Sequence, residues 1–323
     1  MLDIQTLVGL SKDLSAGLCI GLGAIGAALG EGYTAGFANK AISQRPEKGG
    51  DIAKSMLVGQ AMAESAAIFA LVIAVLLLFM DVSSAHPLKA FALIGAGLSM
   101  GFGAFGSAVG GGYPAAEACL GISRQPTVTG ELITNMLIGS AVCQTPAIFA
   151  MVISLILMFI GFENEPLNPT WAALIAAGLS TGLSSIGSGI GGGMPAGESC
   201  AGIARNPESA GQITTAMLVG QAVAQTPCIF GLLVSFILIF KEPSATNSIV
   251  PAIALLSAGI CMGLGGIGPG IGNGYAAQGA VKWIARRVEA SGTLTRIMLV
   301  GQAVSQSTAI YAMVVSLVLI FVL

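Results

Sequence analysis

The chain repeats one sequence unit four times, and this repetition constrains its fold more than any other feature. The loop sequences "ISQRP", "ISRQP", "IARNP" and "IARRV" begin at residues 42, 122, 203 and 284, at intervals of 80, 81 and 81 residues. The stretches "GQAMAESAAIF", "GSAVCQTPAIF", "GQAVAQTPCIF" and "GQAVSQSTAIY" recur at the same intervals. A fixed period of this kind indicates an array of similar structural units.

Each unit contains two apolar segments joined by a short polar loop. The first is rich in glycine and the second in leucine, isoleucine and valine, and each exceeds the ~20 residues that span a bilayer. The chain is 54% hydrophobic and 9% charged, which is far from the balance of a soluble domain. We therefore predict an all-α membrane protein with eight transmembrane helices in four tandem helical hairpins. The hairpins are expected at residues 1–82, 83–163, 164–244 and 245–323. The helices are expected at residues 11–43, 50–80, 88–123, 129–161, 168–204, 210–240, 248–285 and 291–322.

Basic residues orient the hairpins. Three lie on the side of the termini, Lys12, Lys89 and Lys241, and ten lie at or beside the loops within the hairpins. The ten are Lys40, Arg45, Lys48, Lys54, Arg124, Arg205, Lys282, Arg286, Arg287 and Arg296. The positive-inside rule then makes these loops cytoplasmic and both termini external. All four hairpins point the same way, which argues against an inverted-repeat transporter.

The glycines have two possible interpretations. "GLGAIG", "GFGAFG" and "GLGGIG" match the G-x-G-x-x-G pattern of dinucleotide-binding proteins, but no strand precedes them and no acidic residue follows at the required distance. In a membrane helix, glycines instead let two backbones approach closely. We expect an inner circle of glycine-rich helices, with the bulkier second helices outside and facing lipid.

Glu64 is a carboxylate in the middle of an apolar helix. The equivalent positions hold amides, Gln144, Gln225 and Gln306. A charge at the bilayer centre costs at least ~2.5 to 3.5 kcal/mol, so Glu64 should be neutralised by a proton or a bound cation. It is expected to carry ions; the alternative is a permanently protonated hydrogen-bond donor between helices. Since an amide cannot change charge, the glutamines either bond to neighbouring helices or help to ligate an ion held by an adjacent hairpin.

These residues resemble the rotor-ring proteolipid, the c or K subunit of rotary ATPases. The resemblance rests on "GQAMAESAAIFALV" after a glycine-rich helix and a "SQRPE" loop, and it covers nearly the whole chain. It implies a ring of hairpins in lipid, an outer-helix carboxylate that carries H+ or Na+, and a stator membrane subunit with an arginine. Catalysis would lie in other subunits, so the chain itself is not expected to be an enzyme. The loops would contact central-stalk subunits through Arg45, Arg124, Gln125, Arg205 and Asn206, and the fourth loop departs from the pattern at Val288.

The resemblance also bears on the transported ion. Sodium-binding members combine an inner-helix Gln with "ES-T-xx-Y" on the outer helix. Here Glu64 and Ser65 match, but Ala66, Phe69 and Glu31 replace Thr, Tyr and Gln. The predicted ion-binding residues are Glu64, Ser65, Glu31 and Met62, with Asn273, Gln144, Gln225 and Gln306 as supporting candidates. We favour Na+ at Glu64 and Ser65, with H+ as the alternative, and expect no other cofactor.

Glu31 and Glu64 are predicted to lie at similar depth. They lie ~16 Å and ~21 Å from the loop, at 1.5 Å of rise per helical residue. Two carboxylates this close would titrate as a pair and could share a proton when one Na+ is bound. Repeat 4 is interpreted as a decayed sodium site, because Gln306 replaces the carboxylate.

The sequence therefore predicts a rotor-ring subunit with one competent carboxylate per chain. Fewer ions per turn allow each ion to be driven against a steeper gradient, which favours an ATP-driven pump over a synthase. The alternative is a stand-alone ion channel or carrier built from parallel repeats. No nucleic-acid partner is expected.

Overall fold

The fold confirms the predicted all-α membrane architecture. The computed structural model describes residues 3–81, 86–162 and 165–322, and within them eight helical spans are long and apolar enough to cross a membrane. The glycine-rich helices are α1 (Ile4–Gln44), α3 (Leu88–Arg124), α6 (Leu167–Arg205) and α9 (Val250–Ile284). The returning helices are α2 (Gly49–Phe79), α4 (Thr129–Cys143), α5 (Thr145–Phe159), α7 (Ala210–Ala224), α8 (Thr226–Phe240) and α10 (Ser291–Phe321).

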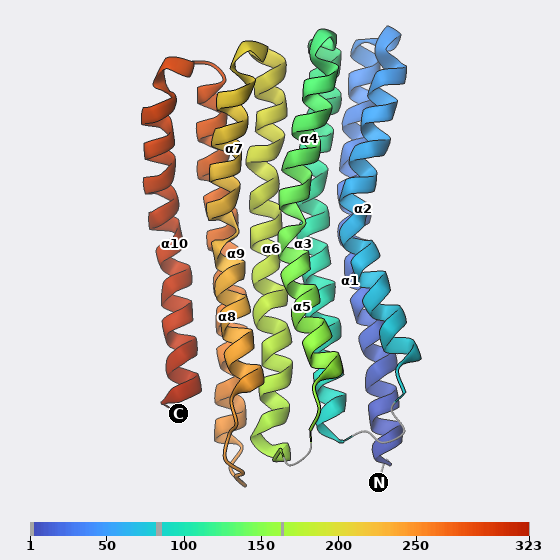
Figure 1. The fold of residues 1–323 in the computed structure, drawn as a ribbon, viewed down its shortest axis with the longest axis vertical. Helices are drawn as coiled ribbons and strands as arrows, with labels where there is room; N and C mark the ends of the chain where they lie inside the picture. Colours follow the sequence, from blue (N-terminus) through green and yellow to red (C-terminus); the bar gives the residue numbers. More distant parts are fainter. Residues whose placement is uncertain (1–2, 82–85, 163–164, 323) are drawn as a thin grey trace.

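The helices form two layers. The glycine-rich helices α1, α3, α6 and α9 pack side by side in chain order, and the returning helices cover one side of that row (Figure 1). Helix α2 packs between α1 and α3, α4 with α5 between α3 and α6, and α7 with α8 between α6 and α9. Helix α10 contacts α9 but has no further inner helix beside it. Both termini lie at one end of the molecule and the within-hairpin turns at the other (Figure 1).

Glycine permits the close approach of the inner helices. A Cβ added at Gly26 would lie 2.5 Å from the Phe105 backbone, and one added at Gly106 would lie 2.5 Å from the Ile186 backbone. Any larger side chain would separate the helices. The sequence prediction that these glycines serve helix packing is confirmed.

The returning helices of hairpins 2 and 3 are interrupted, whereas the sequence predicted them as continuous. The breaks fall at Gln144, between α4 and α5, and at Gln225, between α7 and α8. Pro146 and Pro227 follow two residues later, and proline has no N–H for the carbonyl four residues earlier. The carbonyls of Val142 and Val223 therefore lack their usual backbone donor.

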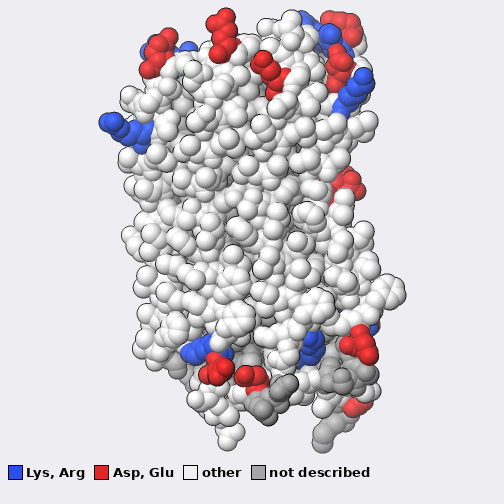
Figure 2. Space-filling view, viewed as in Figure 1, with Lys and Arg blue, Asp and Glu red and all other residues white. Residues whose placement is uncertain are grey.

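Charged side chains gather at the two ends of the molecule and leave a wide band between them almost free of charge (Figure 2). At the end with the termini, Lys12 Nζ donates to the Leu78 carbonyl at 3.0 Å. Lys89 and Lys241 donate in the same way to carbonyls at the ends of α5 and α10. These lysines satisfy carbonyls that have no partner inside the helix. Which end faces the cytoplasm stays a prediction.

Candidate functional site

Glu64 lies on an open edge of the four-hairpin body. It projects from α2 and is exposed, and together with Glu31 of α1 it lines a groove of about 270 Å³. The remaining lining is apolar: Ile20, Ala24, Ala27, Ala28, Ala67, Ile68 and Leu71. The predicted pair of carboxylates thus occurs in one groove. All of its lining residues belong to α1 and α2, and none belongs to hairpin 2.

The three equivalent amides are buried between hairpins. Gln144, Gln225 and Gln306 are 6%, 8% and 8% exposed. Gln144 Nε2 donates to the Met62 carbonyl at 3.0 Å, and Gln225 Nε2 donates to the Val142 carbonyl at 2.7 Å. Each of these two bonds joins the outer helix of one hairpin to that of the preceding hairpin.

The fourth hairpin makes the same connection through a relay. Asn273 Nδ2 donates two hydrogen bonds, one to Gln306 Oε1 at 2.8 Å and one to the Val223 carbonyl at 3.4 Å. Asn273 and Gln306 therefore bond to each other and to hairpin 3. They lie away from Glu64 of their own chain.

The prolines and the amides form a matched set that the sequence interpretation did not connect. Pro146 removes the N–H that would bond the Val142 carbonyl in a continuous α-helix, and Gln225 of the next hairpin donates to that carbonyl. Pro227 likewise removes the α-helical donor to the Val223 carbonyl, and Thr226 Oγ1 and Asn273 Nδ2 donate to it. The signal was the repeated "QTP" triplet, because a proline two residues after a buried amide frees the carbonyl two residues before it.

Met62 and Ser65 lie apart from the Glu64 groove, although the sequence grouped all three. Ser65 Oγ donates to the Met62 carbonyl at 2.7 Å, and Gln144 of hairpin 2 binds the same carbonyl. Residues 62 and 64 differ by about 200° around a helix with 3.6 residues per turn. The Met62 carbonyl thus contacts hairpin 2, Glu64 and Glu31 line the open groove, and a role of Met62 and Ser65 in ion binding stays a prediction.

The packing also decides which inner helix each outer position meets. Gln144 lies beside Gly111 of its own hairpin, since a Cβ at Gly111 would lie 3.2 Å from Gln144 Nε2. Glu64 correspondingly lies beside Glu31 of its own hairpin. The remaining side of the Glu64 groove is open within one chain.

The loop residues lie at the end of the molecule opposite the termini. Arg45, Gln125 and Asn206 directly follow the last turns of α1, α3 and α6, and Arg124 and Arg205 end α3 and α6. Arg45 Nε forms an ion pair with Glu47 at 3.5 Å, and Asn206 Nδ2 donates to the Ala285 carbonyl at 3.4 Å. These loops form one polar surface on the four turns.

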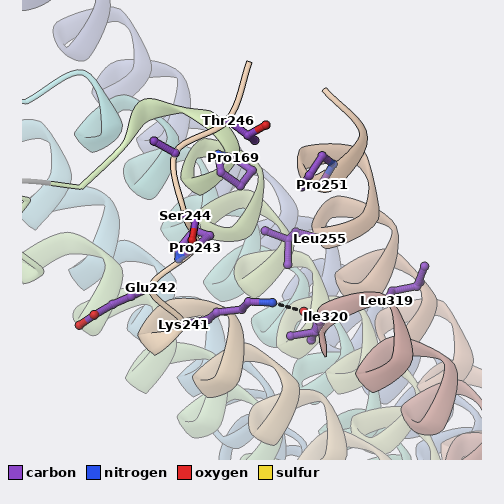
Figure 3. A pocket seen from close by; sticks show the side chains of 11 residues that line it. Pro169, Lys241, Glu242, Pro243, Ser244, Thr246, Pro251, Leu255, Leu319 and Ile320 are labelled. Carbon is purple, nitrogen blue, oxygen red and sulfur yellow. Dashed lines mark hydrogen bonds between the residues drawn. The ribbon is translucent and has the colours of Figure 1, made fainter. Parts of the chain in front are cut away.

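Other cavities of the described residues lie away from the Glu64 groove. Glu117 and Glu198 line one of about 230 Å³ together with Tyr33, Tyr113, Met194, Gly197, Tyr275 and Gln278. Another, of about 350 Å³, lies beside the connection between hairpins 3 and 4, where Lys241 reaches the Ile320 carbonyl (Figure 3). Within the described residues, no cluster of three or more His, Cys, Asp or Glu side chains could hold a metal ion.

Parallel helical hairpins with a carboxylate inside an outer helix define the membrane proteolipids as a class. Each of the four hairpins matches the family model of the ATP synthase C subunit, at residues 14–77, 94–157, 175–238 and 256–319. The chain therefore belongs to the ATP synthase C-subunit family, whose members form the ion-translocating rotor ring. It carries four copies of the family's hairpin in tandem.

Individual relatives match one hairpin of this chain. The ATP synthase c subunit of Prochlorococcus marinus strain AS9601 is 49% identical over 75 residues, which are 23% of this chain and 93% of that protein. That of Petrotoga mobilis is 51% identical over 69 residues, 21% of this chain and 72% of that protein. That of Mesomycoplasma hyopneumoniae is 41% identical over 80 residues, 25% of this chain and 78% of that protein. The predicted family is thus confirmed.

Proposed function

We propose that copies of this chain form the rotor ring of a rotary ATPase and that Glu64 carries one ion per chain across the membrane. One observation supports this assignment above all. Among the four equivalent outer-helix positions, Glu64 alone holds a carboxylate, and it lies in an open groove, whereas the amides are buried and hydrogen-bonded.

The mechanism follows from the cost of charge in lipid. Glu64 must be neutral, through a proton or a bound cation, while it faces the apolar bilayer. Beside an arginine of a stator membrane subunit the ionised form is stabilised, so the ion is released there. Reloading from the other side of the membrane makes the step directional. Gln144, Gln225 and Gln306 have no ionised form and pass the stator without exchanging an ion.

The groove favours Na+ over H+. Sodium is a hard cation that binds oxygen ligands, and Glu31 and Glu64 offer carboxylate oxygens in one groove. A pair that shares one proton carries a single negative charge, which one Na+ neutralises. Proton transport would need Glu64 alone.

Carbodiimide labelling of Glu64 distinguishes the two ions. Sodium transport predicts that NaCl at constant pH protects Glu64 from labelling, while KCl at the same ionic strength does not. Equal labelling in both salts would overturn the assignment to Na+ and leave H+.

The ratio of carboxylates to hairpins favours an ATP-driven pump. One carboxylate per four hairpins lowers the number of ions per turn, so each ion receives more of the energy of ATP hydrolysis. The purified complex should hydrolyse ATP to build a steep gradient and synthesise ATP poorly at ordinary ion-motive force. Ready synthesis under those conditions would contradict the pump.

Copurification tests the rotor-ring function itself. We expect the within-hairpin loops to face the cytoplasm and to bind central-stalk subunits through Arg45, Arg124, Gln125, Arg205 and Asn206. Tagged chain should then recover soluble ATPase subunits, and Arg124→Ala with Arg205→Ala should reduce that recovery. Ion flux through the purified chain alone, without soluble subunits, would instead support the stand-alone channel or carrier.

A further inference from the structure

The tyrosine-lined cavity of about 230 Å³ takes its walls from all four glycine-rich helices. Tyr33 comes from α1 and Tyr275 from α9, while the two helices between them supply Glu117 and Glu198. The four repeats contribute different side chains to it. The chain therefore builds one composite cavity from its four hairpins, and this cavity has no role in the proposed ion transport.

The cavity lies on the face of the inner row that points away from the returning helices. Gly111 of α3 faces the returning helix, since a Cβ there would lie 3.2 Å from Gln144 Nε2. Tyr113 follows two residues later, about 200° farther around α3, and Glu117 lies one turn beyond it on the same face. The Glu64 groove is formed by other residues, so the two sites are separate.

Three of the four repeats place a tyrosine at the cavity. Tyr33, Tyr113 and Tyr275 are equivalent, and Met194 holds this position in hairpin 3. The ring centroids of Tyr33 and Tyr113 are 5.3 Å apart, with the rings edge to face. Tyr33 and Tyr275 are 41% and 63% exposed, so both rings are accessible to a ligand. Aromatic faces attract cations, and cages of such rings recognise quaternary ammonium groups.

Two carboxylates add negative charge to the same cavity. Glu117 and Glu198 are half-buried, and the equivalent positions in hairpins 1 and 4 hold Phe37 and Gly279. Of the described residues that line the cavity, none is basic, and neither carboxylate belongs to an ion pair. The nearby Lys40 Nζ lies over the Phe37 ring instead, 5.9 Å from its centroid. A half-buried carboxylate without a partner is costly, and a bound cation lowers that cost.

Beyond the cavity, toward the middle of the helices, the same face is apolar. One turn from the tyrosine positions, the four repeats place Leu29, Val109, Ile190 and Ile271. Leu29 is 55% exposed and the other three are half-buried. Glu117 itself lies ~10 Å from the end of α3 at Arg124, at 1.5 Å of rise per residue. A ligand whose charged group enters the cavity can therefore lay an apolar chain along this face.

We propose that the cavity binds the ammonium group of an amphiphile. The charge lies between Glu117 and Glu198, the tyrosine rings line its sides, and the apolar chain packs on the face that begins at Leu29. This chemistry has two sources, the ammonium headgroup of a membrane lipid and a soluble alkylammonium compound. The proposal is independent of the proposed function, because Glu64 lies in a different groove.

Calorimetric titration of the purified full-length protein with hexyltrimethylammonium bromide, in a neutral detergent, tests the site. We expect saturable binding of this probe. Hexanol has the same apolar chain without the charge and should not bind measurably. Absence of saturable binding by hexyltrimethylammonium, or equal binding of hexanol, would overturn the proposal.

The charge of the cavity is tested by a double variant. Glu117→Gln combined with Glu198→Gln should weaken binding of the probe at least about 10-fold, because the opposite charge is removed. Glu131→Gln, on the exposed surface of α4 near the same end of the molecule, is the matched control and should bind like the wild type. Circular dichroism checks that helix content is unchanged. Equal affinity of the double variant and the wild type would overturn the assignment of the two carboxylates.

The aromatic wall is tested at Tyr275, whose exposed position tolerates substitution. Tyr275→Phe keeps the ring and should retain the affinity for the probe within about 2-fold, whereas Tyr275→Leu should lower it about 10-fold. This split distinguishes attraction to the ring face from a hydrogen bond to the hydroxyl. If Tyr275→Leu bound the probe as tightly as Tyr275→Phe, the aromatic cage would be wrong.

Displacement of the probe distinguishes the two sources of the ligand. Dihexanoylphosphatidylcholine carries an ammonium headgroup and displaces the probe if the site accepts lipid, whereas dihexanoylphosphatidylglycerol lacks the ammonium group and should not. Retention of the probe in both lipids supports a soluble alkylammonium ligand. Equal displacement by both lipids would contradict recognition of the ammonium group.

One further variant keeps this proposal distinguishable from the proposed function. Glu64→Gln should bind hexyltrimethylammonium like the wild type, although we expect it to lose ion transport. A loss of probe binding in Glu64→Gln would show that the cavity and the Glu64 groove act together, and would overturn the proposal of a separate site.

Discussion

The surroundings of Glu64 and of Gln144 differ although the two residues occupy the same position in the repeat. Gln144 is buried, lies beside Gly111 and binds the Met62 carbonyl of the preceding hairpin. Glu64 is exposed, lies beside a second carboxylate and meets no preceding hairpin in its own chain. The difference teaches that duplication made two kinds of interface from one unit. Interfaces inside the chain became fixed by amides, and the one at its edge kept a group that can change charge.

The largest expected effect comes from removing that charge. Glu64→Gln should reduce ATP-driven ion transport by at least about 100-fold, because removing an essential ionisable group removes the carrier itself. The measurement is ion uptake into proteoliposomes that contain the complex. Glu117→Gln, in the separate tyrosine-lined cavity, is the control and should retain transport. If Glu64→Gln and Glu117→Gln took up ions equally well, Glu64 would not be the ion carrier, and it would not differ in function from Gln144.

The converse substitution, Gln144→Glu, should lower the stability of the protein without creating a second ion-carrying residue. Gln144→Glu places a buried carboxylate beside Gly111, with no second carboxylate, and should lower the free energy of unfolding by about 3 kcal/mol. Thermal unfolding in detergent measures the loss. Gln212→Glu, on exposed α7 surface, is the control and should change it little. A stable Gln144→Glu chain with additional Na+-protected labelling would show that interior positions remain able to hold ions.

A smaller contrast is expected between two glutamines of the same motif. Gln221→Ala removes two buried hydrogen bonds and should cost about 2 kcal/mol, whereas Gln60→Ala removes one and should cost about 1 kcal/mol. Both losses are measured by thermal unfolding in detergent. Equal losses would mean that the edge and the interior are equally bonded within one chain.

The smallest effect is expected at the ends of the helices. Lys12→Met removes the donor to the Leu78 carbonyl and should lower the free energy of unfolding by no more than about 1 kcal/mol. Thermal unfolding with Lys54→Met as the control measures it. A loss as large as that of Gln221→Ala would show that this end bond, too, fixes the hairpin.

The repeats and apolar segments were enough to predict the eight spans, the hairpins and the glycine packing, since these depend on period and residue size. The pairing of Glu31 with Glu64 in one groove followed from helical rise alone. The side of α2 that each residue faces could not be predicted, because it depends on which neighbour the outer helix packs between. Ser65 was grouped with Glu64 on the resemblance to sodium-binding members, and that grouping stays a prediction. Pro146 and Pro227 signalled the helix breaks at Gln144 and Gln225. The sequence could not show that Gln225 binds the Val142 carbonyl, because that contact depends on how neighbouring hairpins pack.

The matched prolines and amides also have an evolutionary consequence. Because Pro146 removes the helical donor of the Val142 carbonyl and Gln225 donates to it, replacing Gln225 alone would leave that carbonyl short of a donor. Converting hairpin 2 or 3 into an ion-carrying hairpin therefore requires several simultaneous substitutions, because the glutamine also holds a contact between hairpins. The number of ion-carrying carboxylates per chain is therefore maintained by these contacts as well as by the fourfold repetition of the hairpin.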